Sequence, residues 1–234
     1  GFQGIFVGSG AGLPNFMDIP GENALNIMSS NEYLTRVNLM DAANPSTDTP
    51  INLGKKVLVV GGGNTAMDSC RTAKRLGADV TLVYRRSEAE MPARIEEVKH
   101  AKEEGIKFLT LHNPKEYLMD ENGAVKSAVL DVMQLGEPDQ SGRRRPETTG
   151  ETITIECDQV IVAVGVSPNP LVPKSIEGLT LGRKNTIAVN DQMQSSRKEI
   201  YAGGDIVRGG ATVILAMGDG RRAAMNMSKQ LTEA

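Results

Sequence analysis

The chain has 234 residues, of which 39% are hydrophobic and 24% charged, enough for one large or two modest globular cores. A net charge of -3 with both signs interspersed argues against a nucleic-acid partner or a membrane surface. No apolar stretch approaches the roughly 20 residues that a membrane helix needs and no signal-peptide pattern opens the chain, so we expect a cytoplasmic protein.

Cysteine and histidine are too sparse to indicate a metal site or a nucleophile. Cys70 and Cys157 show neither C-x-x-C nor metal-ligand spacing, and we expect both to be buried thiols. His100 and His112 stand alone, so nothing favours a histidine metal site or a Ser/His/Asp hydrolase. The chain has no initiator Met and its first residues are typical of the middle of a domain, so we expect a fragment of a longer protein.

The first predicted strand runs into a glycine-rich turn over residues 4–12. Pro14 and Pro20 follow and disfavour a helix, so this turn lacks the helix that a dinucleotide fingerprint requires. Ser29 and Glu32 have capping-box spacing and predict a helix through about residue 40. The polar stretch 41–50 is typical of a linker, and we place a domain boundary near residue 50.

Residues 55–68 predict a buried strand that stops on glycines and turns directly into a helix. In the pattern G-x-G-x-x-G/A, Gly61 allows the tight turn, Gly63 lets the backbone approach a pyrophosphate, and Ala66 permits close helix–strand packing. A second strand over 79–84 completes the βαβ spacing. This context favours a dinucleotide site over a purely structural turn.

The end of that second strand distinguishes the two nicotinamide dinucleotides. An NAD site places an acid there for the ribose 2′-hydroxyl, whereas an NADP site needs cations for the 2′-phosphate. The chain offers Arg85 and Arg86, whose planar guanidiniums suit phosphate oxygens, and Ser87 adds a hydroxyl. We therefore predict NADP(H); the alternative is an ordinary solvated basic pair.

The middle of the chain predicts a crossover helix and then an antiparallel insertion. The helix is expected to begin at Met91-Pro92 and to end at Gly105, before a third parallel strand. Further strands are expected, together with a polar hairpin tip over 136–150 that holds the arginine run 143–145. Their predicted ranges are 106–111 for the parallel strand, 117–119, 125–132 and 152–155 for the insertion, and 158–165 for a strand buried on both faces.

The last segment carries a second glycine-ended strand, over residues 200–205, followed by a helix that begins near 209 and runs past 224. Asp205 at the strand end is suited to accept a hydrogen bond from a hydroxyl. The positive end of the following helix can face a phosphate or an electron-rich ring. The alternative is a plain strand–helix connection in which Asp205 is a turn or capping residue.

Taken together, these blocks resemble the two-dinucleotide-binding flavoproteins, and most closely the small (beta) subunits of NADPH-dependent glutamate synthase with their electron-bifurcating and sulfide-dehydrogenase relatives. The resemblance covers essentially the whole chain and implies an α/β fold. It rests on residues 8–14, 19–23, 61–68, 84–87, 92–94, 168–170, 202–205 and 211–214. A Rossmann-like NADP-binding domain with an antiparallel insertion would span 51–166, inserted in a partial FAD-binding domain made of 1–50 and 167–234.

The resemblance also implies which residues contact cofactors. Arg94 would either reach the 2′-phosphate or pair with Glu97. No side chain need act as acid or base, and Asp68 is expected to face the dipole of the first helix turn. The NADP(H) set is Gly61, Gly62, Gly63, Asn64, Thr65, Ala66, Arg85, Arg86 and Arg94, with Ala163, Val164 and Gly165 along its path; Gly204, Asp205, Ala211 and Thr212 would face FAD and the nicotinamide.

In function, the resemblance implies an NADPH-dependent flavoprotein oxidoreductase that passes electrons from NADPH through FAD and iron-sulfur centres to the glutamate synthase large subunit. The iron-sulfur cysteines and the first FAD-binding βαβ would precede Gly1, so this chain alone is expected to bind NADPH but not FAD tightly and to be inactive. A thioredoxin-reductase type would need a C-x-x-C pair, which the chain lacks. The alternatives are a related subunit that uses ferredoxin-type acceptors and a non-catalytic NADP-binding module.

Overall fold

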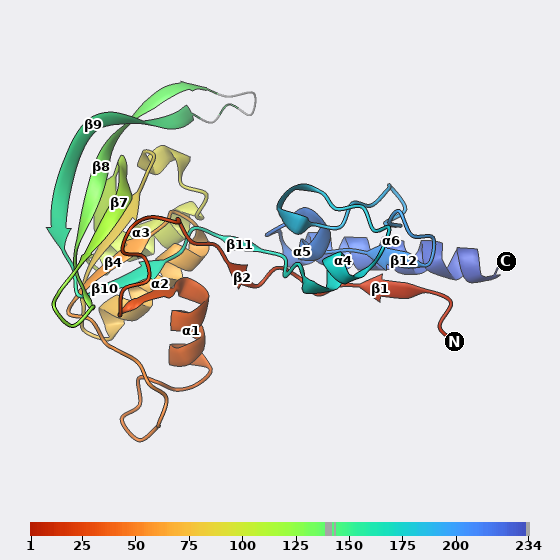
Figure 1. Ribbon diagram of the computed structural model, residues 1–234, viewed down its shortest axis with the longest axis horizontal. Helices are drawn as coiled ribbons and strands as arrows, with labels where there is room; N and C mark the ends of the chain where they lie inside the picture. Colours follow the sequence, from red (N-terminus) through yellow and green to blue (C-terminus); the bar gives the residue numbers. More distant parts are fainter. Residues whose placement is uncertain (139–141, 143, 233–234) are drawn as a thin grey trace. The chain divides into compact units, whose positions relative to one another are not determined.

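The computed structural model describes residues 1–138, 142 and 144–232, which form two compact units (Figure 1). We call Pro14–Val164 the central unit, and Gly1–Leu13 with Gly165–Ala234 the terminal unit. The central unit holds the predicted strand–glycine–helix stretch, and the terminal unit holds the second glycine-ended strand.

A five-stranded parallel sheet forms the middle of the central unit. Its order is β3-β10-β4-β5-β6, and each neighbouring pair is parallel. The continuous apolar runs of β4 and β10 lie in the middle of this sheet, where both faces are covered. The strands are β3 (Ile27–Ser29), β4 (Lys56–Val60), β5 (Asp79–Tyr84), β6 (Lys107–Thr110) and β10 (Gln159–Val162).

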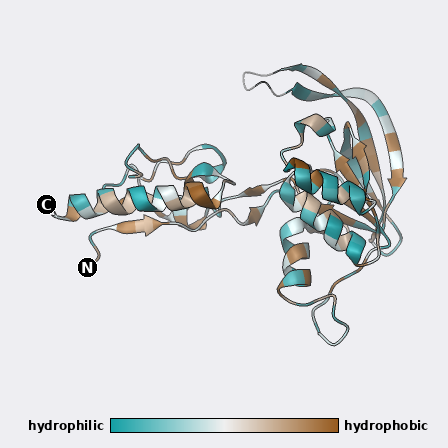
Figure 2. Cartoon of the chain, turned by 180° about the vertical axis from the view of Figure 1, so that it is seen from behind, coloured by the Kyte–Doolittle hydropathy of each residue, from teal (hydrophilic) through white to brown (hydrophobic). Residues whose placement is uncertain are grey.

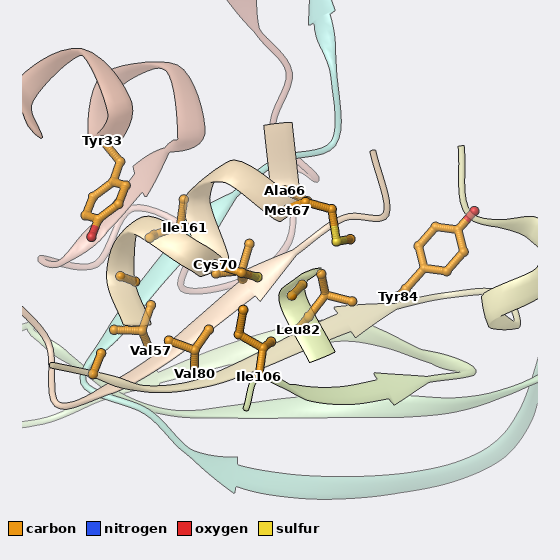
Figure 3. Packing of buried hydrophobic residues seen from close by; sticks show 14 of the residues in the cluster. Tyr33, Val57, Ala66, Met67, Cys70, Val80, Leu82, Tyr84, Ile106 and Ile161 are labelled. Carbon is orange, nitrogen blue, oxygen red and sulfur yellow. The ribbon is translucent and has the colours of Figure 1, made fainter. Parts of the chain in front are cut away.

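Helices cover one face of the parallel sheet. Alternate side chains of its strands point to opposite sides, so every second residue of a strand packs against these helices. Val57 and Val59 of β4 join the cluster that includes Met67 and Cys70 of α2 (Figure 3). Burial in the same cluster raises the pKa of Tyr33 to about 12. The helices on this side are α1 (Ser30–Asn38), α2 (Asn64–Arg75) and α3 (Ile95–Glu103), and the 3-10 turn η1 (Glu88–Glu90) lies between β5 and α3 in the chain.

An antiparallel three-stranded sheet packs on the other face, where Leu58 and Val60 of β4 meet Leu130. Its strands are β7 (His112–Met119), β8 (Val125–Pro138) and β9 (Arg144–Glu156). The predicted antiparallel insertion is confirmed, but the polar tip predicted over 136–150 is largely strand. Pairing with β8 keeps these residues in a strand despite their polar composition. Because most β9 side chains are exposed, the strand needs no apolar residues there. Arg143 of the arginine run lies outside the described residues.

Residues 27–38 belong to the central unit, although the sequence placed a boundary near residue 50. The parallel pairing of β3 with β10 and the burial of Tyr33 against the α2 side of the sheet hold them there. The predicted helix cap is confirmed, since the Ser29 hydroxyl accepts the Glu32 N–H at 3.1 Å. The assignment of 1–50 and 167–234 to an FAD-type domain stays a prediction.

The terminal unit is built on the parallel pair β1 and β12. Its core contains Val7, Ile187, Ile200 and Ile206. Its elements are β1 (Ile5–Val7), α4 (Leu171–Ser175), the 3-10 turn η2 (Arg183–Asn185), β12 (Ile200–Ala202), α5 (Asp205–Arg208) and α6 (Val213–Thr232); the short strands β2 (Leu13–Pro14) and β11 (Val166–Ser167) pair with each other.

The beginning of α6 is apolar and exposed, and Figure 2 shows it as a brown segment of the long helix. Val213 is 75% exposed and Ile214 81%. Within the described part of the chain, no helix is long and apolar enough to cross a membrane, and no cluster of three or more His, Cys, Asp or Glu residues could hold a metal ion.

Candidate functional site

The glycine elbow, residues 61–63, turns the chain from β4 into α2. Gly61 has φ +144, and a Cβ built on it would collide with the carbonyl oxygen of Ala163. Its N–H donates to the carbonyl oxygen of Val83 at 3.0 Å. This bond ties the elbow to the end of β5, so the turn and the predicted cationic stretch are neighbours in space.

The other two glycines of the elbow have different surroundings. A Cβ on Gly62 would lie 2.7 Å from the ring of Tyr84, whereas a Cβ on Gly63 would meet nothing within 4 Å. Gly63 is therefore the position at which the backbone is open to a ligand. Its conformation is ordinary, with φ -91, so the need for glycine there is one of space and not of strain.

The N-terminus of α2 has the properties of an anion site. Gly63 is its N-cap, no described side chain caps the helix, and none of its first-turn residues is acidic. The first N–H groups of a helix have no partner within the helix and lie at its positive end. Asn64 and Thr65 are exposed there, and Ala66 is fully buried against the sheet, as its predicted packing role requires.

Residues 91–94 lie against the elbow instead of opening the helix, so the predicted helix start at Met91-Pro92 is wrong. The Ala93 N–H donates to the Gly62 carbonyl oxygen at 3.0 Å, and the Arg94 N–H donates to Asn64 Oδ1 at 2.9 Å. These bonds hold the segment outside the helix until Ile95. They also fix the backbone of Arg94 beside the N-terminus of α2, a role for Asn64 that sequence reasoning missed.

The alternative partner of Arg94 is engaged elsewhere. Glu97 pairs with Arg71, whose Nη1 lies 2.8 Å from Glu97 Oε2, and among the described ion pairs Arg94 has none. The Arg94 side chain is exposed. It therefore remains available to an anion, and its predicted contact with the 2′-phosphate stays a prediction.

The end of β5 places Arg85 and Arg86 as predicted. Arg85 is exposed, whereas Arg86 is partly buried and its Nε donates to the main-chain oxygen of Arg144 at 2.9 Å. The Ser87 hydroxyl donates to Glu90 Oε2 at 2.8 Å. An acid thus lies at this strand end after all, supplied three residues beyond Ser87 through a capping box that the Ser-x-x-Glu spacing could have revealed.

Residues 163–165 follow β10 on the other side of the elbow. The Ala163 N–H donates to the Val60 carbonyl oxygen at 2.8 Å, so Ala163 borders the turn directly. Val164 and Gly165 are exposed. Their place along a bound dinucleotide stays a prediction.

The second glycine-ended strand has a different outcome. Gly204 has φ +76, and Asp205 heads the four-residue helix α5, which the sequence did not predict. Asp205 Oδ1 accepts the Ala211 N–H at 3.1 Å, the turn role that had been the alternative. The helix α6 begins at Val213, four residues later than the predicted start near 209. At this helix start the Thr212 hydroxyl accepts the Leu215 N–H at 3.4 Å.

An ion pair between a buried aspartate and an exposed arginine supports this second turn, and sequence reasoning missed it. Asp219 of α6 is 1% exposed and accepts two hydrogen bonds, each 2.6 Å, from Nε and Nη2 of Arg208. Its Oδ2 also accepts the Gly204 N–H at 3.1 Å. The Arg208 guanidinium holds the pKa of Asp219 below its usual range, against the opposing effect of burial.

The remaining candidate groups have no role in either turn. Asp68 lies beyond the first turn of α2, so the expected dipole role is wrong; burial, with Glu97 nearby, raises its pKa. Cys70 and Cys157 are buried, as predicted, and burial raises the pKa of Cys157 to about 12. Both thiols are therefore protonated at neutral pH.

Comparison with protein families gives one match over most of the chain. The model of the family described as pyridine nucleotide-disulphide oxidoreductase matches residues 2–220. Both glycine turns described above fall within the matched range.

Two curated relatives show how far the likeness extends. The chain is 40% identical over 208 residues to the NADPH-Fe(3+) oxidoreductase subunit beta of Geobacter sulfurreducens, a match that covers 79% of this chain and 31% of the relative. It is 35% identical over 231 residues to the glutamate synthase (NADPH) small chain of Halomonas elongata, covering 95% and 48%. The chain thus spans less than half of either relative.

A solved structure shares the fold. FprA of Mycobacterium tuberculosis in complex with NADPH superposes with a TM-score of 0.80 at 19% identity, covering 99% of this chain and 64% of that one. The predicted α/β fold with a parallel Rossmann-type sheet is confirmed by this likeness and by the sheet order of the central unit.

Proposed function

We propose, from the premise that this chain belongs to the pyridine nucleotide-disulphide oxidoreductase family, that its central unit binds NADPH and serves an FAD-dependent oxidoreductase. The observation that carries the proposal is the uncapped N-terminus of α2, tied by the bond from Gly61 to Val83 to a strand end with two arginines. The diphosphate and the 2′-phosphate of a phosphorylated dinucleotide each have a matching feature there.

The diphosphate of the coenzyme would lie at the elbow. Gly63 leaves open space where a side chain would stand, and the first N–H groups of α2 face the anion. Arg94, held by Asn64 at the same helix end, would add a cation. These groups bind and orient the coenzyme, and none of them needs to exchange a proton.

The 2′-phosphate would lie at the end of β5. Arg85 is free of ion pairs among the described residues, and the bond from Arg86 Nε to Arg144 leaves both terminal nitrogens of Arg86 for phosphate oxygens. A guanidinium can bind two phosphate oxygens at once, whereas binding a ribose hydroxyl requires no such cation. The site therefore favours NADPH over NADH.

When bound, NADPH supplies a hydride to the flavin, and the cofactors carry that chemistry. In the terminal unit, Asp205 keeps Oδ2 free of described hydrogen bonds, so it can accept one from an FAD hydroxyl. Arg208 and Asp219 would keep the Gly204 backbone in place for that contact. The buried thiols take no part, because both stay protonated.

For the acceptor, we propose the glutamate synthase large subunit, reached through iron-sulfur centres outside this chain. The support is the resemblance of the motif blocks and the 35% identity to a glutamate synthase small chain. The second candidate is a subunit that serves another acceptor, favoured by the 40% identity to an NADPH-Fe(3+) oxidoreductase subunit. A non-catalytic NADP-binding module is the third.

Binding measurements test the first step. Titration calorimetry with NADPH and NADH would compare the chain with its Arg85→Ala/Arg86→Ala variant. We expect NADPH affinity to fall about 30-fold or more and NADH affinity to change little, because charge-assisted bonds contribute about 1.5–3 kcal/mol. Arg221→Ala/Arg222→Ala, which removes an exposed arginine pair from α6, is the matched control. Equal losses for both coenzymes would overturn the assignment.

Rapid kinetics test the later steps. In stopped-flow mixing of the full-length, FAD-loaded protein with NADPH, fast bleaching of the flavin indicates the oxidoreductase, and binding without bleaching indicates the module. Glutamate formation from 2-oxoglutarate and glutamine, measured with and without the large subunit, then separates glutamate synthase from a subunit that reduces another acceptor.

A further inference from the structure

Arg144 of the β8–β9 hairpin contacts two residues that follow β5. Its main-chain oxygen accepts the hydrogen bond from Arg86 Nε at 2.9 Å. Its own Nε lies 3.5 Å from Glu90 Oε1. One residue from the antiparallel sheet therefore contacts both a cation and the acid at the strand end where a 2′-phosphate would bind.

Glu90 places a negative charge near the end of β5, where the proposed site would bind a phosphate. Its side chain is 15% exposed, and its Oε2 accepts from the N–H and the hydroxyl of Ser87 at 3.1 and 2.8 Å. These bonds fix a carboxylate next to Ser87, immediately after the arginine pair. An acid at this end of the strand is the feature that selects a ribose 2′-hydroxyl and opposes a phosphate.

Arg144 supplies the opposite charge to this carboxylate. Its side chain is 56% exposed, and it is the ion-pair partner that Glu90 has among the described residues. With the pair formed, the strand end carries the net positive charge of Arg85 and Arg86. Without it, one negative charge would face the incoming phosphate.

We propose that Arg144 is a specificity-determining residue of the coenzyme site, which offsets the charge of Glu90 and so lets the end of β5 accept a 2′-phosphate. This inference rests on the proposed NADP(H) site. A residue of the antiparallel sheet thereby becomes part of the coenzyme site. Arg144 would favour a 2′-phosphate, and Glu90 alone would favour a ribose 2′-hydroxyl.

A pair of adenosine nucleotides isolates the phosphate contribution. Calorimetry would compare adenosine 2′,5′-bisphosphate with adenosine 5′-monophosphate on the unsubstituted chain and on Arg144→Gln, Glu90→Gln and the double variant. Arg145→Gln is the matched control, because Arg145 is the next exposed arginine of β9 and has no ion pair among the described residues. Thermal melting would establish that each variant is folded.

We expect Arg144→Gln to lower the preference for the bisphosphate about fivefold, the scale of one exposed charge pair, and Arg145→Gln to leave it unchanged. Glu90→Gln alone should raise the preference, since glutamine keeps the hydrogen bonds of the capping box without the charge. The double variant should return close to the unsubstituted chain.

Each outcome decides the question. A preference that stays constant in Arg144→Gln, or that falls equally in the single and the double variant, would overturn the inference, because Arg144 would then act without Glu90. An unsubstituted chain with no preference would contradict the NADP(H) proposal itself, a result visible before any variant is measured. If Arg144→Gln fails to fold, an unchanged preference in Glu90→Gln overturns the inference by itself.

Discussion

The two units each end a parallel strand on glycines and follow it with a helix, but they provide for opposite charges. In the central unit the elbow opens α2 with no side-chain cap and no acid in its first turn, and two arginines lie at the neighbouring strand end. In the terminal unit Gly204 leads into a short helix headed by Asp205, and Arg208 at the end of this helix pairs with the buried Asp219. The same local pattern is thus an anion site in one unit and an acid-bearing turn in the other.

The difference shows where the specificity of a glycine turn comes from. Glycines set only the path of the backbone, and the residues brought beside them set the charge. At Gly61 the neighbours are neutral main-chain groups of Val83 and Ala163, while at Gly204 the neighbour is the carboxylate of Asp219 in α6. Variants of the two turns should therefore fail in different ways.

The largest effect is expected at Gly61. In Gly61→Ala the new Cβ meets the Ala163 carbonyl oxygen, and φ +144 is a conformation that alanine rarely adopts. We expect the free energy of unfolding to fall by about 3 kcal/mol, the combined scale of backbone strain and a steric clash. Urea unfolding measures it. A loss below about 0.5 kcal/mol would show that the elbow relaxes and that the turn is less constrained than its geometry indicates.

A smaller loss is expected at Asp219, which supports the other turn. Asp219→Asn removes the charge that Arg208 faces, and we expect a loss of about 2 kcal/mol at pH 7. Asp191→Asn, at an exposed aspartate of the same unit, is the control.

The effect of Asp219 depends on pH in a defined direction. Because its folded pKa lies below the ordinary value of about 3.9, its stabilisation is present above that value and lost as the pH falls through the folded pKa. The difference between Asp219→Asn and the unsubstituted chain should therefore shrink below about pH 4. A difference that stays constant from pH 7 to pH 3 would contradict the charge argument.

Gly63→Ala should separate binding from stability. Its φ of -91 suits alanine and the position is open, so we expect the unfolding free energy to change by less than about 1 kcal/mol. A Cβ there would stand where the diphosphate approaches, so NADPH affinity should fall about tenfold, or about 1.4 kcal/mol. Calorimetry and urea unfolding on the same variant give both values. Unchanged affinity would place the diphosphate elsewhere.

The smallest effect is expected for Asn64→Ala, which removes the acceptor of the Arg94 N–H. One hydrogen bond contributes about 1 kcal/mol, so NADPH should bind about fivefold more weakly as Arg94 loses its fixed backbone. Thr72→Ala, at a partly exposed neutral position later in α2, controls for a change in the helix itself. A fivefold loss in Asn64→Ala that Arg94→Ala does not reproduce would show that Asn64 contacts the coenzyme by another route.

Much of the fold could be predicted because its signals are local. Continuous apolar runs predicted β4 and β10, the glycine and small-residue spacing predicted the elbow with α2, and Ser29 predicted the start of α1. The length of the β8–β9 hairpin could not be predicted, since residues 144–150 are polar and exposed, and pairing with β8 holds them in a strand. The helix start at 91–92 was wrong because its backbone bonds go to Gly62 and Asn64.

By itself, the sequence determined the glycine turn and the two arginines that follow the next strand, because each is a pattern of residues adjacent along the chain. Only the tertiary structure decided that Arg144 meets Glu90 and that Asp219 holds Arg208. These partners are 54 and 11 residues apart, and no local pattern records a contact that forms only when a hairpin or a helix packs against a distant strand end.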